Sequence, residues 1–262
     1  MISLLDSCVV HEPFRLSECD RVNLNHEKIL MTDNFVFSEV PNKHKFCWLI
    51  EPQTFIKNEY RYVMNNIKKF DKIFTHSKLM LDNCSNSIFM PYGTTFLSEN
   101  EFKIYKKTKL ISMISSNKNF LPGHSFRLKV IEKLRQTSVV DIFGRGFNEI
   151  EKKCFGLADY CYSIAIENSK YDFWFTEKLI DCFLAGTIPI YYGCPSISKF
   201  FNVKGMYQID NMSDLDNVIS KISFEDYYSK IDAVKDNFQR SLEYLDPFKK
   251  VYNIIKNYKH GN

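Results

Sequence analysis

A glutamate and a lysine stand side by side where the sequence predicts the first turn of a helix. Thr176 can cap a helix over 176–185, which places Glu177 and Lys178 in that turn. A lysine there opposes the helix dipole unless an anion shares the site. A diphosphate on this helix start would use the free amides and Lys178, and Glu177 would accept hydrogen bonds from sugar hydroxyls. The alternative is that Glu177 is only a favourable first-turn acid and Lys178 a solvated side chain.

Polar residues also follow the strand that precedes this helix. The apolar run 160–167 is typical of a buried strand, and it leads into Glu167 and Asn168. In open α/β sheets, ligands bind at the carboxyl ends of the strands. Phe173 and Trp174 stand directly before the cap, where we expect them at the surface. These features favour a ligand site over a plain helix start.

Two further charged residues have both a functional and a structural interpretation. Arg127 lies on a helix predicted over 125–136 and is either an anion-binding residue or an ordinary surface arginine. Glu51 follows the apolar strand 45–50 and precedes Pro52. It is either a catalytic carboxylate or only the end of a strand.

Other titratable residues have plain structural explanations. Arg145, in a Gly-Arg-Gly turn, is more often a structural arginine that pairs with a nearby acid such as Asp141, and a ligand contact is the alternative. His76 and His124 have no partner that the sequence identifies, so they are expected to be ordinary strand-end and loop residues.

The sequence Asp214-Leu215-Asp216 has the spelling of a metal-binding DxD motif. It follows Ser213 at a predicted helix start, where capping and first-turn acidity explain both acids. No metal site is therefore expected.

Short apolar strands alternate with helical patterns along most of the chain. The predicted strands are 45–50, 71–77, 87–93, 110–115, 138–144, 160–167, 187–193 and 206–210. The predicted helices are 57–70, 78–83, 125–136, 176–185 with Gly186 as its stop, 213–222, and a helical tail from 224 in which Pro247 ends or kinks the helix before the last. This alternation predicts parallel strands joined by crossover helices.

The segment 97–109 has no clear period and is interpreted as a connection between two such series. We therefore expect a domain over 1–104, a second over 105–245 and a C-terminal helical tail over 246–262. Two α/β halves facing each other would leave a cleft at the carboxyl ends of their strands.

The composition is that of a soluble globular protein. Of the 262 residues, 45% are hydrophobic and 25% are charged, and the formal net charge is only +4 with no basic tract, so nucleic acid is not an expected partner. Eight scattered cysteines without a CxxC pair are interpreted as free thiols of a cytosolic protein. No apolar run approaches the roughly 18 residues of a membrane span.

Three stretches resemble one enzyme family, the α1,3/4-fucosyltransferases of glycosyltransferase family 10. They are Glu167-Asn168 with 176-TEK-178 and 185-AGTIPIYYG-193, then 115-SSNKNFLPGHSFRLKVIEKL-134 with 141-DIFGRG-146, and 47-CWLIEP-52 with 89-FMPYG-93. The resemblance covers about residues 45 to 210. It is strong over 112–202, moderate over 45–93 and absent in the first forty residues.

The resemblance implies an α/β protein of two Rossmann-like domains facing across a cleft, the type called GT-B, here with a reduced amino-terminal half. It implies an inverting transfer of fucose from GDP-fucose to a hydroxyl of a glycan acceptor, with no required metal or other cofactor. The donor and the glycan would be the partners. Because the chain contains no stem or membrane anchor of the animal type, a cytoplasmic bacterial or viral enzyme is expected.

The resemblance also implies roles for single residues. Lys178 and Arg127 match the residues that contact the donor diphosphate, Glu177 the acid that binds the ribose, and Asn168 the asparagine of the same wall. Glu51 matches the carboxylate proposed as the general base. The remaining candidates for donor contacts are Trp174, which stands where many relatives have tyrosine, and Asn117, Arg145 and Tyr171.

Two alternatives stay open at this point. The same scaffold could use another nucleotide sugar, because the diphosphate-binding residues match better than those of the base and sugar. A non-catalytic module that binds a nucleotide sugar or a glycan is the other, because the amino-terminal half is short for a Rossmann-like domain.

Overall fold

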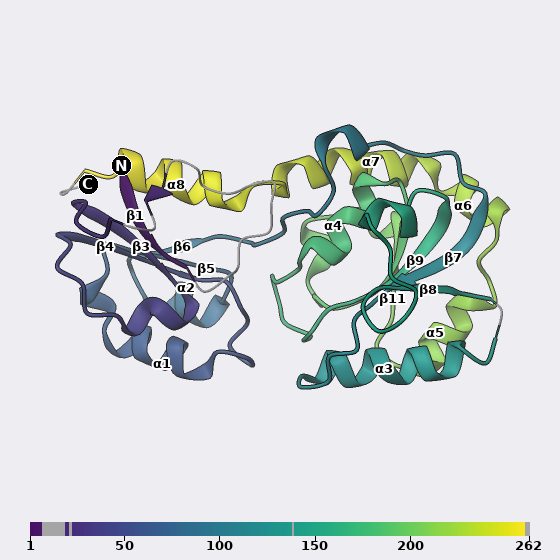
Figure 1. The fold of residues 1–262 in the computed structure, drawn as a ribbon, viewed down its shortest axis with the longest axis horizontal. Coiled ribbons are helices and arrows are strands. Elements are labelled where there is room, and N and C mark those ends of the chain that lie inside the picture. Colours follow the sequence, from purple (N-terminus) through teal and green to yellow (C-terminus); the bar gives the residue numbers. More distant parts are fainter. Residues whose placement is uncertain (7–18, 21–22, 138, 260–262) are drawn as a thin grey trace. The chain divides into compact units, whose positions relative to one another are not determined.

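The computed structural model describes residues 1–6, 19–20, 23–137 and 139–259, which divide into two compact units (Figure 1). The first unit comprises Met1–Tyr92, Asp172–Trp174 and Asp246–Asn262, and the second comprises Gly93–Tyr171 and Phe175–Leu245. Each unit contains one parallel β-sheet with helices on its faces. The predicted α/β class with parallel sheets is therefore confirmed.

The first unit is built on a six-stranded sheet of order β2-β1-β3-β4-β5-β6. Its strands are β1 (Ile2–Leu5), β2 (Cys19–Asp20), β3 (Lys28–Thr32), β4 (His44–Leu49), β5 (Lys72–Thr75) and β6 (Ser87–Phe89). Its helices are α1 (Lys57–Asn65), α2 (Lys78–Asn83) and α8 (Pro247–Asn257).

Successive residues of β4 face opposite sides of this sheet, as the pleat requires. Phe46 and Trp48 join an apolar cluster with α8, whereas Cys47 and Leu49 join a cluster with α1 and α2. Figure 1 shows α8 on one face of the sheet and α1 and α2 on the other.

Lys28 ties the last helix to this sheet. Its Nζ donates hydrogen bonds to the carbonyl oxygens of Ile255, Lys256 and Tyr258 at 2.8, 3.0 and 2.8 Å. The last carbonyls of a helix have no partner inside it, and a cation there also suits the helix dipole. Helix α8, in the stretch expected as a separate tail, thus belongs to the first unit.

The second unit has a five-stranded sheet of order β11-β10-β9-β7-β8. Its strands are β7 (Lys109–Ile114), β8 (Asp141–Phe143), β9 (Tyr160–Ile166), β10 (Ile188–Tyr192) and β11 (Tyr207–Gln208). Its helices are α3 (Pro122–Leu134), α4 (Glu177–Leu184), α5 (Met212–Ile219), α6 (Phe224–Ser229) and α7 (Ile231–Ser241). Residues of α3 and α5 share one apolar cluster, and those of α4 belong to another. Figure 1 shows α3 and α5 on one side of this sheet and α4 on the other.

Short 3₁₀ helices connect several of these elements. They are Asp33–Phe37, Ile67–Lys69, Glu99–Glu101, Lys153–Gly156, Ile197–Lys199, Val203–Gly205 and Leu242–Tyr244.

The predicted elements occur, with shifts at their ends. The helix expected over 57–70 ends at Asn65 and gives way to a 3₁₀ turn. Helix α3 begins at Pro122 rather than at 125, because proline suits the first turn of a helix. Helix α5 is capped by Asn211 rather than Ser213. Strands β1 to β3, in the first forty residues, were not predicted.

The segment 97–109, expected as a connection between domains, lies inside the second unit. Leu97 is buried there, and so is Lys107. The Lys107 Nζ donates to the carbonyl oxygens of Ala158 and Ala185 at 2.9 and 2.8 Å and to Thr187 Oγ1 at 3.0 Å. The sequence does not show that carbonyl oxygens of distant residues bind this lysine. The segment was therefore misinterpreted as a solvated connection between domains.

The cysteines agree with the sequence-based expectation as far as the described residues reach. Seven cysteines are free thiols and six of them are buried, while Cys8 lies outside the described residues. Within the described ranges, no helix has the length and apolar character that crossing a membrane requires.

Candidate functional site

The start of α3 rests directly on the carboxyl end of β9. The amide N of Gly123 donates to Asn168 O at 3.0 Å. A Cβ at Gly123 would lie 2.0 Å from Glu167 O and 2.6 Å from Asn168 O, closer than any side chain tolerates. Gly123 therefore allows α3 to place its first turns beside Glu167 and Asn168.

We expect Gly123→Ala to lower the free energy of unfolding, although alanine is the better helix former. Propensity alone would stabilise the variant by about 0.5–1 kcal/mol. Because the obstructing atoms are backbone oxygens that cannot rotate away, overpacking of about 1–3 kcal/mol should outweigh it. Urea unfolding measures the difference. Gly156→Ala is the control, since the atoms nearest to its Cβ would be side-chain atoms of Ile114 and Ile150, which can move, rather than backbone oxygens. A Gly123 variant as stable as wild type would contradict the close packing.

Arg127 projects from α3 into this region and is only 4% exposed. Its Nη2 donates to Ile166 O at 2.7 Å and to Asn168 Oδ1 at 3.1 Å. Among the described residues, no carboxylate lies within 4.0 Å of the guanidinium, and Nε and Nη1 donate no hydrogen bond. Burial lowers the pKa of Arg127, although Glu167 and Glu177 oppose that shift from farther away. A buried cation without a counter-ion in contact is rare, because burying an unpaired charge is costly.

The start of α4 is fixed by Glu167, the buried acid at the end of β9. Thr176 donates to its carboxylate from the backbone N at 2.9 Å and from Oγ1 at 2.7 Å. Thr176 Oγ1 in turn accepts from the amide of Lys178, so it is the N-cap that the sequence predicted. Cap, strand end and helix start therefore form one hydrogen-bonded unit.

Lys178 lies between two carboxylates. Its Nζ is 3.0 Å from Glu177 Oε1 and 3.5 Å from Glu167 Oε2, and the side chain is 22% exposed. Burial by itself would lower the pKa of Lys178, but Glu177 and Glu167 raise it above the usual value. Lys178 is thus an ion-paired cation, and the interpretation as a solvated side chain is wrong.

Glu177 and Glu167 differ in their protonation behaviour. Burial alone would raise the pKa of Glu177, but Lys178 and Lys153 hold it at about 2. Burial raises the pKa of Glu167, and Lys178 only partly offsets this. Glu177 is accordingly a carboxylate at neutral pH and can accept hydrogen bonds from hydroxyl groups.

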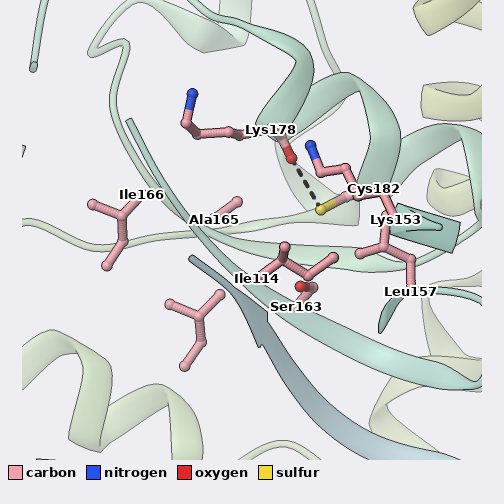
Figure 2. A pocket seen from close by; sticks show the side chains of 9 residues that line it. Ile114, Lys153, Leu157, Ser163, Ala165, Ile166, Lys178 and Cys182 are labelled. Carbon is pink, nitrogen blue, oxygen red and sulfur yellow. Dashed lines mark hydrogen bonds between the residues drawn. The ribbon is translucent and has the colours of Figure 1, made fainter. Parts of the chain in front are cut away.

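A small cavity lies beside Lys178. Its volume is about 20 Å³, which is room for about one water molecule. Figure 2 shows the ammonium groups of Lys178 and Lys153 on the same side of it. The residues that line it are Ile114, Lys153, Leu157, Ser163, Ile164, Ala165, Ile166, Lys178 and Cys182.

Lys153 is a residue that the sequence analysis missed. Its Nζ lies 2.6 Å from Asp181 Oδ2, and its charge contributes to the low pKa of Glu177. Asp181 is buried on α4, where Thr95 and the amide of Phe96 also donate to it. In the sequence, Lys153 stands in an unremarkable polar stretch, so only the tertiary fold reveals its position.

Asn117 and Arg145 lie on the loops that follow the neighbouring strands β7 and β8. A Cβ at Gly146 would lie 3.0 Å from Asn117 Nδ2, which places the two loops side by side. Arg145 is exposed. Asp141, the acid suggested as its partner from the sequence, accepts a hydrogen bond from Tyr160 Oη at 2.6 Å. Tyr171 is half-buried in the loop after β9. Their roles in donor binding stay predictions.

Trp174 lies in the first unit, unlike Arg127 and Lys178. Its side chain is buried rather than at the surface, and its Nε1 donates to Ile50 O at 3.1 Å. Phe173, just before it, has a positive φ of 61°, which turns the chain at this point. The structure thus places Trp174 next to the strand end that leads to Glu51.

Glu51 stands half-buried after β4, held from the side by Asp33 after β3. The Asp33 Oδ1 accepts from the amides of Ile50 and Glu51 at 2.8 and 3.4 Å. Asp33 is buried and has a φ of 40°, a strained value for a residue other than glycine and a feature common at functional sites. Asp33 was not predicted from the sequence, although its position directly after a buried strand was an available signal.

The two histidines and the DxD sequence have definite positions. His76 follows β5 and is buried near the Trp174 ring, and burial lowers its pKa to about 3. His124 is in α3 rather than in a loop, buried close to Arg127. Asp216 pairs with Lys133 at 2.5 Å. In the described part of the chain, no group of three or more His, Cys, Asp or Glu side chains could hold a metal ion.

A known protein family matches most of the second unit and all of α8. The model of "Glycosyltransferase family 10 (fucosyltransferase) C-term" matches residues 104–258, more than half of the chain.

Curated relatives match over shorter stretches. The "Alpha-(1,3)-fucosyltransferase FucT" of Helicobacter pylori is 35% identical over 79 residues, 30% of this chain and 16% of that protein. The "4-galactosyl-N-acetylglucosaminide 3-alpha-L-fucosyltransferase 9" of Cricetulus griseus is 33% identical over 122 residues, 45% of this chain and 33% of that protein. The chain thus spans a third or less of the length of these relatives.

A solved structure shares the fold over most of its length. The crystal structure of an α1,3-fucosyltransferase with GDP-fucose has a TM-score of 0.56 to this chain at 19% identity. The similarity covers 92% of this chain and 82% of the other. At this identity it shows a common fold.

Proposed function

The chain belongs to glycosyltransferase family 10, and on this premise we propose that it transfers fucose from GDP-fucose to a hydroxyl group of a glycan, with inversion and without a metal. Two Rossmann-like units, the second for the donor and the first for the acceptor, are part of the proposal. The free, mostly buried cysteines favour a reducing compartment, so we include a cytoplasmic location.

The buried guanidinium of Arg127 is the observation that carries this proposal. It has no counter-ion in contact within the described structure. Lys178, at the amino end of α4, lies close enough that the charge of Arg127 lowers its pKa. A diphosphate would supply the missing negative charge and would accept hydrogen bonds from the Arg127 guanidinium and the Lys178 ammonium. GDP-fucose contains a diphosphate. The family match and the fold shared with a structure solved with GDP-fucose support the choice of this donor.

Each residue then has a defined chemical task. The acceptor oxygen forms a bond to the anomeric carbon of fucose while the bond from that carbon to the diphosphate oxygen breaks. Arg127 and Lys178 stabilise the negative charge that grows on the departing GDP, so a side-chain acid is not needed there. Glu51 takes the proton of the acceptor hydroxyl as general base. Attack from the face opposite the leaving group inverts the anomeric centre.

Glu177 and Asn168 position the donor in this proposal. The Glu177 carboxylate accepts hydrogen bonds from the ribose hydroxyls, for which its low pKa keeps it ionised. Asn168 accepts a hydrogen bond from Arg127 at its Oδ1 and so helps to orient the guanidinium. Asn117, Arg145, Tyr171 and Trp174 complete the set of proposed donor contacts.

A thermal-shift panel tests the donor. We expect GDP and GDP-fucose to raise the melting temperature of the protein, while UDP, CMP and their sugars leave it unchanged. A ligand that binds only the native state at a hundred times its Kd stabilises it by about 2.7 kcal/mol. A shift with UDP or CMP sugars alone would favour another donor, and no shift with any nucleotide would contradict the donor site. A 4-galactosyl-N-acetylglucosaminide, named in the Cricetulus griseus relative, is the first acceptor for transfer assays.

A further inference from the structure

His124 is a buried titratable residue that the proposed reaction does not use. It lies three residues before Arg127 on α3, and only 2% of it is exposed. The Phe120 ring packs against the imidazole with a centroid distance of 4.5 Å and an edge-to-face angle of 72°. In the described structure, Nδ1 is buried and has no hydrogen-bond partner, while the ring interacts with the Asn168 side chain.

Positive charges face the imidazole from three elements. Arg127 comes from its own helix, Lys118 from the loop before it, and Lys178 from α4. Burial first, and then these cations, lower the pKa of His124 to about 4. The two acids of this region, Glu167 and Glu177, are both engaged by Lys178. Without a ligand, His124 is therefore neutral at physiological pH.

A bound diphosphate changes the balance of charge around this ring. Its two negative charges would lie among the same three cations and would favour the protonated imidazole. Protonation makes Nδ1 a donor, which gives this buried nitrogen a partner among the phosphate oxygens. We propose that His124 is a further binding residue for the donor diphosphate and that it takes up one proton from solvent when the diphosphate binds.

This inference rests on the proposed donor site and predicts the direction in which donor affinity changes with pH. Since the pKa of His124 is higher in the complex than in the free protein, protons are bound on association and returned when GDP leaves. Donor affinity therefore rises as the pH falls. If binding restores the pKa of His124 to the ordinary histidine pKa of about 6.5, the affinity for the donor should be roughly fourfold higher at about pH 6 than at about pH 8.

Calorimetry of GDP-fucose binding in buffers of different ionisation enthalpy counts the protons directly. GDP-fucose is the suitable probe, because its phosphates lack the second ionisation near pH 6 that a terminal phosphate has. At about pH 6 we expect the full chain to take up a large fraction of one proton. His124→Gln should bind GDP-fucose about fourfold more weakly than wild type at about pH 6, with no proton uptake and no change of affinity between about pH 6 and about pH 8. His26→Gln, a half-buried histidine of the first unit, should behave like wild type.

The possible results separate this inference from the proposed function. Binding of GDP-fucose by wild type without proton uptake at about pH 6 overturns the role of His124 and leaves the function intact. The same holds if His124→Gln still takes up the proton. If GDP-fucose does not bind to wild type at all, the proposed function itself fails. If His124→Gln does not fold, the absence of proton uptake by wild type at about pH 6 still overturns the role of His124.

Discussion

Arg127→Ala is expected to slow fucosyl transfer by about a hundredfold or more and to weaken GDP binding. A hydrogen bond to a charged group contributes about 1.5–3 kcal/mol, so the dissociation constant of GDP should rise roughly tenfold or more. The rate should fall further than affinity, because the negative charge on GDP grows as the glycosidic bond breaks. Calorimetry with GDP and initial rates with GDP-fucose measure the two effects.

Arg135→Ala is the matched control. Arg135 directly follows the same helix, is exposed, and has its Cζ 4.9 Å from the centroid of the Phe147 ring. It should leave both GDP affinity and rate unchanged. Circular dichroism and thermal melting check that Arg127→Ala keeps its fold, since Ile166 O and Asn168 lose a donor. A folded Arg127→Ala protein that binds GDP like wild type would exclude the proposed diphosphate site.

Arg127 separates binding from stability better than Lys178 does. Lys178 stands between Glu177 and the fully buried Glu167, so its removal leaves acids without their cation. Removing one partner of a buried ion pair is strongly destabilising, by about 3–5 kcal/mol. Loss of activity in a Lys178 variant would therefore mix two causes, whereas Arg127 has no carboxylate in contact among the described residues.

The sequence was informative where local rules decide the structure. Thr176 as N-cap and Gly186 as the helix stop follow from capping chemistry, and Gly186 indeed has a φ of 64°. The end of a buried strand marks Glu167 and Asn168, because parallel strands bring their carboxyl ends to one edge. The prediction that Arg127 binds the donor came from the family resemblance. The helical pattern around it was equally compatible with an ordinary surface arginine.

The sequence was silent where partners lie far apart in the chain. Lys153 reaches the cavity beside Lys178 only because the fold of the second unit brings the 3₁₀ helix Lys153–Gly156 next to residues of β7, β9 and α4. His124 looked like a loop residue, but Pro122 starts the helix earlier and buries the ring. Lys107 was interpreted as part of a polar linker, although carbonyl oxygens from two other segments hold it. No local pattern contains such information.

Trp174 shows the same limit at the level of a short segment. The residues on either side of Asp172–Trp174 belong to the second unit, yet these three belong to the first. The turn at Phe173 and the hydrogen bond from Trp174 Nε1 to Ile50 O fix this course. An aromatic residue before a helix cap gives no sign of it, so the expectation of a surface position failed.

The first forty residues show how three-dimensional support can arise without a recognisable motif. Strand β3 ends at Thr32, and Asp33 then accepts the amide hydrogen bonds of Ile50 and Glu51. The strained backbone of Asp33 is kept because these two hydrogen bonds and its burial fix it. The position of Glu51 thus depends on a residue that lies in a stretch without family resemblance.

Glu51→Gln is expected to lower the rate of transfer roughly 10²–10⁴-fold while GDP affinity stays at the wild-type value. Glutamine keeps the size and polarity of the side chain but cannot accept the proton of the acceptor hydroxyl. Steady-state rates with GDP-fucose and a glycan acceptor, together with GDP calorimetry, measure the two quantities. Glu59→Gln, in the first turn of α1, is the control and should retain the wild-type rate.

The pH profile distinguishes a base from a residue that only supports the fold. If Glu51 acts as the base, the wild-type rate should fall at low pH as the carboxylate is protonated, and the residual rate of Glu51→Gln should lose this limb. A structural role would lower the rate without changing the profile. Transfer by Glu51→Gln at the wild-type rate would show that another group accepts the proton, and Asp33, held next to Glu51 in the same unit, would then be the first residue to substitute.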